Sequence, residues 1–185
     1  MVYIVDFGST KSGEIEAVVS SFAYPNLCVK WKETDVLTMK KASKIILSGA
    51  PVLLTETSPE PFLEKFAFLK SIPVPVLGIC FGHQLLGLLH GATVFKGKEV
   101  RNSIPVDILQ PDPIFLGVKT GALFKEDHTE GISLPDGFVH LAKSADYQIE
   151  AMKHPFKSIY GVQFHPEVSF ENGRQLLKNF CIHSS

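Results

Sequence analysis

A lone cysteine stands between two glycines in the segment GICFG, residues 78–82. This spacing is a thiol version of G-x-S-x-G, in which a sharp strand-to-helix turn exposes a nucleophile. Gly78 and Gly82 leave room for the close backbone approach that such a turn needs. The following helix would aim its positive dipole end at the sulfur, which favours the thiolate, and the N–H of Phe81 would be free to bind an oxyanion. We therefore predict that Cys80 is a nucleophile rather than a small buried hydrophobe.

A thiol nucleophile needs a base, and the base needs an orienting group. Of the seven histidines, His165 is the candidate, because it ends the apolar run IYGVQFH and is followed by Pro166 and Glu167. Two residues apart, His165 and Glu167 can point the same way, so that the carboxylate fixes the ring tautomer and supports the imidazolium. The alternative is a histidine that caps a strand beside a solvated glutamate. Together with the cysteine turn, the pair predicts a triad of Cys80, His165 and Glu167.

The first half of the chain alternates short apolar runs with helical patterns. Strands are expected at 2–7, 27–31, 44–49 and 74–79, and helices at 14–22 with Ser12 as cap, after Ser58-Pro59, and at 82–90. This alternation with short connections predicts an α/β fold, an open and mostly parallel sheet with helices on both faces. In such sheets ligands bind just past the carboxyl ends of strands, where Cys80 would lie.

The second half lacks strong helices until its end. Strands are expected at 92–96, 105–109, 138–144, 149–154 and 159–165, and a last helix at about 171–182. We expect this half to add antiparallel strands to the sheet, in a flavodoxin-like arrangement. We find no internal repeat or linker, and therefore predict a single domain over residues 1–185.

Composition excludes several classes of function. The chain has 185 residues and a formal net charge of −1, so it offers no basic patch for nucleic acid. No segment reaches the roughly 18 apolar residues of a membrane span, and the start has no signal-peptide pattern. Three cysteines, an odd number far apart, favour reduced thiols in the cytoplasm over a disulfide framework.

The segments GICFGHQ around Cys80 and GVQFHPE ending at Glu167 resemble those of the class I (triad) glutamine amidotransferases. The likeness spans nearly the whole chain. It implies that glutamine is the substrate, and that Gln84 belongs to the glutamine pocket. The turn SGAP resembles the family's SGGP turn, which implies that the backbone N–H groups of Gly49 and Ala50 join that of Phe81 in binding the oxyanion.

Within the family, residues 134–168 are similar to the glutaminase subunit of two-chain GMP synthetases, as found in archaea, through their IEAMKH and IYGVQFHPEV segments. This resemblance implies glutamine hydrolysis through a Cys80 thioester. It also implies a partner, a separate ATP-pyrophosphatase synthetase subunit that uses ATP and Mg²⁺ and aminates XMP to GMP. The chain has no G-x-x-x-x-G-K-[ST] motif, so we expect no cofactor and no metal in this chain itself.

Some residues depart from the family's pattern. Thr10 stands where the family usually has glutamine, Ala50 where a second glycine is usual, and residues 101–103 where GMP synthetases carry a Glu-Tyr pair. The segment DHTEGI, with His128 and Glu130, resembles the family's SH-x-D-x-V with glutamate for aspartate. Three alternatives stay open: an amidotransferase for another acceptor such as chorismate, a stand-alone γ-glutamyl hydrolase, and a catalytically silent regulatory module.

Overall fold

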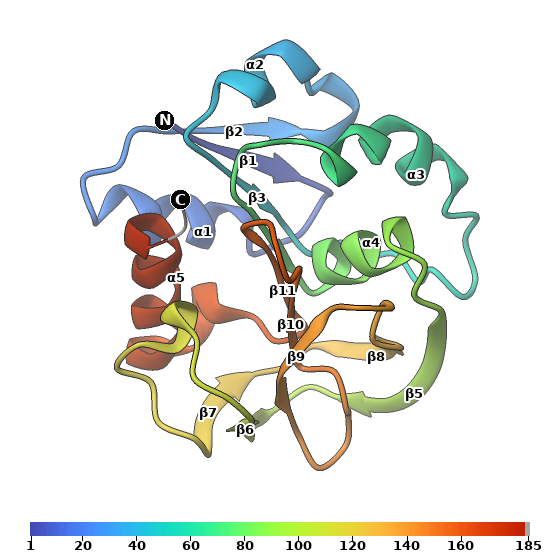
Figure 1. Ribbon diagram of the computed structural model, residues 1–185, viewed down its shortest axis with the longest axis vertical. Helices are drawn as coiled ribbons and strands as arrows, with labels where there is room; N and C mark the ends of the chain where they lie inside the picture. The colour runs from blue at the N-terminus through green and yellow to red at the C-terminus, as the bar shows by residue number, and fades with distance from the viewer. Residues whose placement is uncertain (184–185) are drawn as a thin grey trace.

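The computed structural model of the chain describes residues 1–183 (Figure 1). Within them nine strands form one sheet, in the spatial order β2 (Asn26–Lys30), β1 (Val2–Asp6), β3 (Lys44–Leu47), β4 (Val76–Ile79), β11 (Ile159–Val162), β10 (Ala151–Lys153), β9 (Val139–Lys143), β6 (Ser103–Ile108) and β7 (Ala122–Lys125). Strands β2 to β11 in this order are parallel, and the pairs from β11 to β7 are antiparallel. This confirms the predicted α/β sheet with an antiparallel second half.

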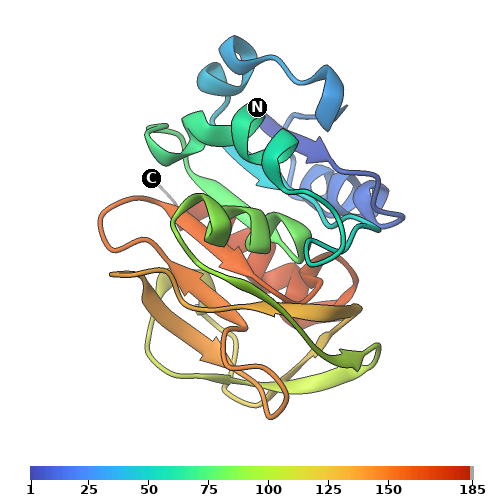
Figure 2. The same cartoon turned by 90° about the vertical axis from the view of Figure 1, so that its right-hand side faces the viewer.

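Helices cover both faces of this sheet. Helices α1 (Ser12–Ser20) and α5 (Phe170–His183) lie on one face, and α3 (Glu60–Phe66) and α4 (Phe81–Leu89) lie on the other, which is turned toward the viewer in Figure 2. Each face of the sheet has its own hydrophobic core, and alternate residues of β1 belong to each. Val2 and Ile4 pack toward α1 and α5, whereas Tyr3 and Val5 pack toward α3 and α4. Strands β3, β4 and β11 are buried at every position, as parallel strands covered on both faces must be.

One predicted strand does not join the sheet. Strand β5 (Val94–Val100), predicted at 92–96, pairs instead with β8 (His128–Ile132) in a separate antiparallel ribbon. Most of β5 is exposed, because this ribbon lies over the edge of the core rather than within it (Figure 2). The expectation that the whole second half extends the sheet is therefore wrong for this segment.

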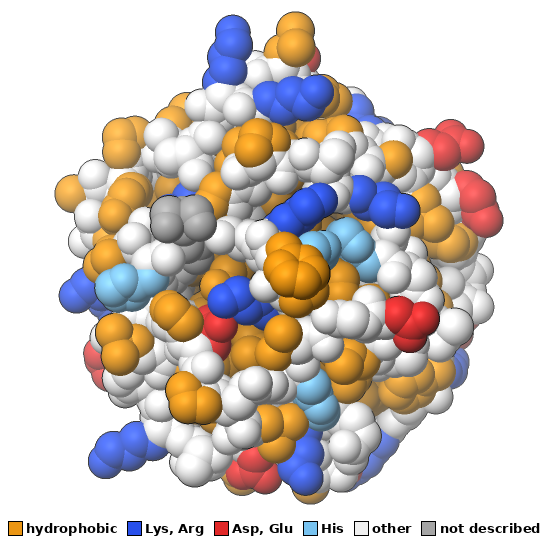
Figure 3. Space-filling view, in the orientation of Figure 1, with side chains coloured by type: hydrophobic (Ala, Val, Ile, Leu, Met, Phe, Trp, Pro, Cys, Tyr) orange, Lys and Arg blue, Asp and Glu red, His pale blue; other side chains and the backbone are white. Residues whose placement is uncertain are grey.

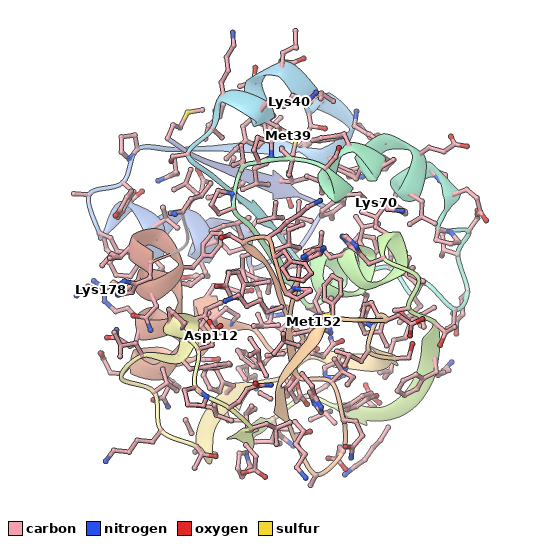
Figure 4. The ribbon with its side chains drawn as sticks, in the orientation of Figure 1. Met39, Lys40, Lys70, Asp112, Met152 and Lys178 are labelled. Carbon is pink, nitrogen blue, oxygen red and sulfur yellow. The ribbon has the colours of Figure 1, made fainter. Side chains whose placement is uncertain are left out.

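Helix α2 (Val36–Lys41) is an element that the sequence pattern does not predict. Asp35 caps it by accepting a hydrogen bond from the N–H of Thr38. Figure 4 labels two of its residues, of which Met39 is buried and Lys40 is exposed. With a single buried residue in six, the helix is too short to show an apolar period.

The ends of some elements also differ from the prediction. Ser12 does not cap α1 but is its first residue, and its hydroxyl donates a hydrogen bond of 2.6 Å to Asp6 Oδ1. Strand β11 ends at Val162, so that His165 lies in the connection beyond it. Short 3₁₀ helices complete the described chain at Trp31–Glu33, Ala67–Lys70, Pro113–Phe115 and Pro166–Val168.

Charged side chains of both signs are scattered over the face shown in Figure 3. Among residues 1–183, no helix combines the length and the apolar character that crossing a bilayer would require.

Candidate active site

Cys80 occupies a strained turn between β4 and α4. Its φ of 51° and ψ of −105° lie where a side chain is disfavoured, at a cost of about 1–3 kcal/mol. The two glycines of the motif make this turn possible. A Cβ on Gly78 would lie 2.4 Å from the carbonyl oxygen of Gly82, and a Cβ on Gly82 would lie 2.5 Å from that of Leu47. The predicted reason for both glycines, close backbone approach, is confirmed.

His165 is held by its backbone as well as by its ring. Its Nδ1 lies 2.7 Å from Oε1 of Glu167, and both side chains are buried. The N–H of His165 donates a 2.8 Å hydrogen bond to the carbonyl of Lys125, and the hydroxyl of Ser169 donates one of 2.6 Å to the carbonyl of His165. The bond to the carboxylate places the Nδ1 proton toward Glu167, which leaves Nε2 to face the cavity side.

Strand pairing brings the cysteine turn to His165. Strands β4 and β11 run parallel with Ile79 opposite Val162, so the residues that follow both strands leave the sheet at the same edge. A Cβ added to Gly49 would lie 3.1 Å from His165 Cε1 and 3.7 Å from Cys80 Cβ, so Gly49 lies against both groups. The structure therefore brings together residues that are 85 positions apart in the chain, 80 and 165.

The surroundings of His165 favour its protonated form. Burial alone would lower the pKa of His165, but the charge and hydrogen bond of the Cys80 sulfur, together with Glu167, raise it to about 10. An imidazole that holds its proton at neutral pH beside a sulfur is the partner of a thiolate. The arrangement can therefore supply a nucleophile and a proton donor at the same time.

Backbone donors surround the sulfur. Phe81 is the first residue of α4, and its N–H has no acceptor within the helix. The N–H of Gly82 donates a 3.1 Å hydrogen bond to the carbonyl of Ser48, which ties the cysteine turn to the SGAP turn. Among residues 1–183, the non-glycine residues with positive φ are Ala23, Cys80 and Phe170, so Ala50 carries no left-handed strain where the family usually has glycine.

A cavity of about 610 Å³ opens onto Cys80 and His165. Its walls come from segments far apart in the chain: residues 9–11 after β1, residues 50–53 at the end of the SGAP turn and just after it, the start of α4, the ribbon of β5 and β8, and Arg101. A cavity of this size, with a buried thiol and a histidine of raised pKa at its wall, is a small-molecule site.

Comparisons with known proteins agree with this geometry. Residues 3–184 match the family described as glutamine amidotransferase class-I. The chain belongs to this family. Over 139 residues it is 43% identical to the glutamine-hydrolyzing GMP synthase subunit of Methanosarcina mazei, covering 74% of this chain and 70% of that one. Over 142 residues it is 42% identical to the protein of that name from Pyrococcus abyssi, covering 75% and 74%.

Solved structures show the same architecture. A putative GMP synthase subunit from Thermoplasma acidophilum superposes with a TM-score of 0.88 at 29% identity, covering 97% of this chain and 90% of that one. A glutamine amidotransferase from Thermotoga maritima superposes with a TM-score of 0.79 at 22% identity, covering 90% and 76%, which shows the fold alone.

In this amidotransferase Gln84 is a buried residue of the cavity wall, not an exposed residue of a helix surface. Its side-chain amide donates 3.1 Å hydrogen bonds to the carbonyl of Glu130 and to Oε1 of Gln163. These bonds fix the amide, so that Gln84 presents a defined orientation to the cavity that it lines.

Glu130 has a positioning role that the sequence did not reveal. Its carboxylate accepts hydrogen bonds from the N–H of Leu54 at 2.8 Å, and from the N–H and hydroxyl of Thr55 at 2.7 and 2.5 Å. These bonds hold the segment that continues the SGAP turn and forms one wall of the cavity. The resemblance of DHTEGI to a family segment was the available signal, but it did not indicate which backbone groups the carboxylate would meet.

The departures from the family's pattern gather at the cavity mouth of the amidotransferase. Thr10 and Arg101 both line it. Asp127 bridges two cations there, Lys11 at 2.6 Å and Arg101 at 2.5 Å, and Arg101 also pairs with Glu99. The mouth is thus framed by a chain of ion pairs contributed by the turns after β1, β5 and β7.

Proposed function

We propose that this chain is the glutaminase subunit of a two-chain GMP synthetase. It is a glutamine-hydrolysing enzyme that releases glutamate and ammonia, and the ammonia passes to a separate ATP-dependent synthetase subunit that aminates XMP to GMP. The observation that carries this proposal is the placement of the Cys80 sulfur beside His165, which is bonded to Glu167, at the wall of a cavity of about 610 Å³. The relatives named as glutamine-hydrolyzing GMP synthase subunits support the choice of acceptor.

The geometry supports a two-step reaction. The Cys80 thiolate attacks the side-chain amide carbon of glutamine, and the resulting oxyanion lies toward the N–H groups of Phe81 and of the Gly49-Ala50 turn. One such donor lowers the barrier by about 3 kcal/mol. The imidazolium of His165 gives its proton to the leaving nitrogen, so that ammonia departs and a thioester forms. His165 then takes a proton from water, which attacks the thioester and frees glutamate and the thiol.

The other residues of the site serve this reaction by position. Glu167 fixes the orientation of the His165 ring and favours its protonated form. The fixed amide of Gln84 gives the cavity a polar group for the substrate. ATP and Mg²⁺ belong to the partner subunit, and the glutaminase chain itself uses no cofactor or metal in catalysis. The three free cysteines support action in the reducing cytoplasm.

The deciding experiment measures glutamine hydrolysis by the chain alone and mixed with the ATP-pyrophosphatase synthetase of the same organism, with XMP, ATP and Mg²⁺. We expect slow hydrolysis alone, faster hydrolysis in the mixture, and one GMP for each glutamate. A chain with Cys80→Ala should support GMP formation only from added ammonia. Equal hydrolysis rates with and without the partner would contradict the proposal.

The alternatives give other results in parallel assays. Amination of chorismate with the matching synthase would identify a different acceptor, and rapid cleavage of γ-glutamyl peptides without a partner would identify a stand-alone hydrolase. Labelling with diazo-oxonorleucine tests the silent module, because a functional Cys80 forms an adduct with this glutamine-like electrophile. Absence of an adduct, with and without the partner, would favour the silent module.

A further inference from the structure

Three ionisable side chains meet beneath the cavity, outside the triad. Glu126 lies between β7 and β8, His128 begins β8, and Glu150 directly precedes β10. Their exposed fractions are 0%, 7% and 0%. One candidate ligand atom from each lies within 4.8 Å of the other two. Two carboxylates and one imidazole, from the ends of β7, β8 and β10, thus lie together in one buried cluster.

The ring of His128 is oriented as a ligand. Its Nδ1 lies 2.8 Å from the carbonyl oxygen of Glu130, and because a carbonyl only accepts, Nδ1 carries the proton. In the neutral ring, Nε2 then presents a lone pair, and it lies 3.0 Å from Oε2 of Glu126. A histidine whose outer nitrogen donates to a backbone carbonyl is the usual arrangement around a bound metal. Two acceptors that face each other at this distance require a positive charge or a proton between them.

The carboxylates lack the partners that buried charges need. Within residues 1–183, no hydrogen bond of strict geometry reaches either oxygen of Glu126 or Glu150, or Nε2 of His128, although the two carboxyls interact with each other and Ser144 interacts with Glu150. Two unsatisfied carboxylates in one buried point are strongly unfavourable unless a cation or protons neutralise them.

His83 and Tyr147, which lie beside the cluster, do not provide this neutralisation. His83 is fully buried near His128, and burial lowers its pKa to about 3, so its ring stays neutral. The ring of Tyr147 packs on His128 with centroids 4.5 Å apart, and its hydroxyl donates to the carbonyl of Lys98 rather than to a carboxylate. Tyr147 therefore covers one side of the cluster, and the charge of His165 acts on Glu126 and His128 from outside it.

We propose that Glu126, His128 and Glu150 bind one divalent transition-metal cation, with Zn²⁺ as the type. Two carboxylates balance its charge, and the imidazole selects against Ca²⁺ and Mg²⁺, which prefer oxygen ligands alone. Three protein ligands leave a fourth position for water, as Zn²⁺ sites of this kind do. His128 lines the cavity, which gives a cation a way in from solvent.

The cation would join segments that hold the triad. Glu126 directly follows Lys125, whose carbonyl accepts the backbone N–H of His165. A metal bound to Glu126, His128 and Glu150 would tie the β7–β8 corner to the start of β10 and so brace the backbone beneath His165. This role is structural and does not depend on the proposed glutaminase activity, because no reacting atom contacts the three ligands.

Metal binding to the chelator-treated chain tests the site. The background carries Cys80→Ala, so that the catalytic thiol cannot act as a ligand. Zn²⁺ is titrated by calorimetry, and Co²⁺ by its visible absorption, which reports nitrogen and oxygen coordination. We expect one equivalent to bind and Zn²⁺ to raise the Tm. Glu126→Gln and Glu150→Gln should each weaken binding by about 10–100-fold, whereas Glu64→Gln, an exposed glutamate of α3, should not.

A second measurement serves if the variants fold poorly. Anomalous diffraction from Co²⁺-loaded crystals of the Cys80→Ala chain should place one peak between Glu126, His128 and Glu150. No saturable binding, a peak elsewhere, or equal affinity in folded Glu126→Gln and Glu150→Gln chains would overturn the proposal. In those cases protons shared by the two carboxyls, rather than a metal, neutralise the cluster.

Discussion

The backbone N–H of Cys80 donates a 2.9 Å hydrogen bond to the carbonyl of Val162, the last residue of β11. This bond continues the parallel hydrogen-bond ladder of β4 and β11 by one residue. It fixes the position of the cysteine turn along the strand that leads to His165. The nucleophile and the base are thus positioned by the same pair of central strands, which are buried at every position. Precision of this kind is what nucleophilic catalysis requires of a scaffold.

Backbone strain at Cys80 predicts that glycine is more stabilising than alanine at this position, the reverse of the usual order in a helix. Because φ is positive there, Cys80→Gly should give a free energy of unfolding about 1–2 kcal/mol higher than Cys80→Ala. Both variants should lose glutaminase activity, by roughly 10⁴-fold or more. Urea unfolding and glutamate release measure the two effects. Cys181 in α5 is the control, since Gly there should be less stable than Ala by about 1 kcal/mol. The same order at both positions would contradict the assigned turn geometry.

The glycines of the turn give a second prediction. Gly78→Ala and Gly82→Ala would place a Cβ 2.4–2.5 Å from backbone oxygens, which the surrounding strands cannot vacate. We expect each to destabilise the fold by about 3 kcal/mol or more, as backbone and overpacking changes in cores do. Thermal and urea unfolding measure this loss.

The matched control for the turn glycines is Gly13 in α1. A Cβ there would meet nothing within 4 Å, so Gly13→Ala should stabilise the chain by about 0.5–1 kcal/mol. If Gly78→Ala proved as harmless as Gly13→Ala, the close approach of α4 to β3 and β4 would be wrong.

The raised pKa of His165 predicts the alkaline limit of activity. The imidazolium is the proton donor and its pKa is raised to about 10, so kcat/KM should stay level through neutral pH and fall as the pH passes about 10. Glu167 is one of the groups that raise this pKa, and Glu167→Gln should therefore move the alkaline limb to lower pH. It should also lower kcat/KM by about 10²-fold or more.

The pH profile has its own control. Glu171 lies in the first turn of α5 and is exposed, so Glu171→Gln should leave both the limb and the rate unchanged. An alkaline limb at the same pH in wild type and Glu167→Gln would show that Glu167 does not act on the His165 ring.

The two parts of the predicted triad, the cysteine turn and the His-Pro-Glu segment, each have a local signature in the sequence, although only the fold brings them together. The glycines at 78 and 82 can serve only a tight turn, and a histidine followed two residues later by a carboxylate places both on one side of the chain. Family membership then followed from two short segments. The sheet centre was equally accessible, since buried parallel strands have continuous apolar runs such as KIIL at 44–47.

What sequence reasoning missed depends on contacts between distant segments. Strand β8 carries buried polar residues, His128 and Glu130, so it lacks the apolar alternation that predicts a strand. Strand β8 pairs with β5, and its residue His128 lies near Glu150, which is distant from it in the chain. Neither the cluster under the cavity nor the contact of Glu130 with residues 54–55 has a local signature, because each joins segments that are distant in the chain: β8 with the residue before β10, and β8 with the segment after the SGAP turn.

The carboxylate of Glu130 provides the last prediction, through its three hydrogen bonds to Leu54 and Thr55. Glu130→Gln keeps the shape but replaces one acceptor oxygen with a donor, so the 50–55 segment should loosen and the KM for glutamine should rise about 10-fold. Thr55→Val removes only the hydroxyl donor and should raise KM less. If Glu130 acts through this segment, the double variant should show a KM well below the product of the two single effects, because both changes break the same contact. Steady-state kinetics of the four proteins measure this coupling, and strictly multiplicative effects would mean that Glu130 meets the substrate by another route.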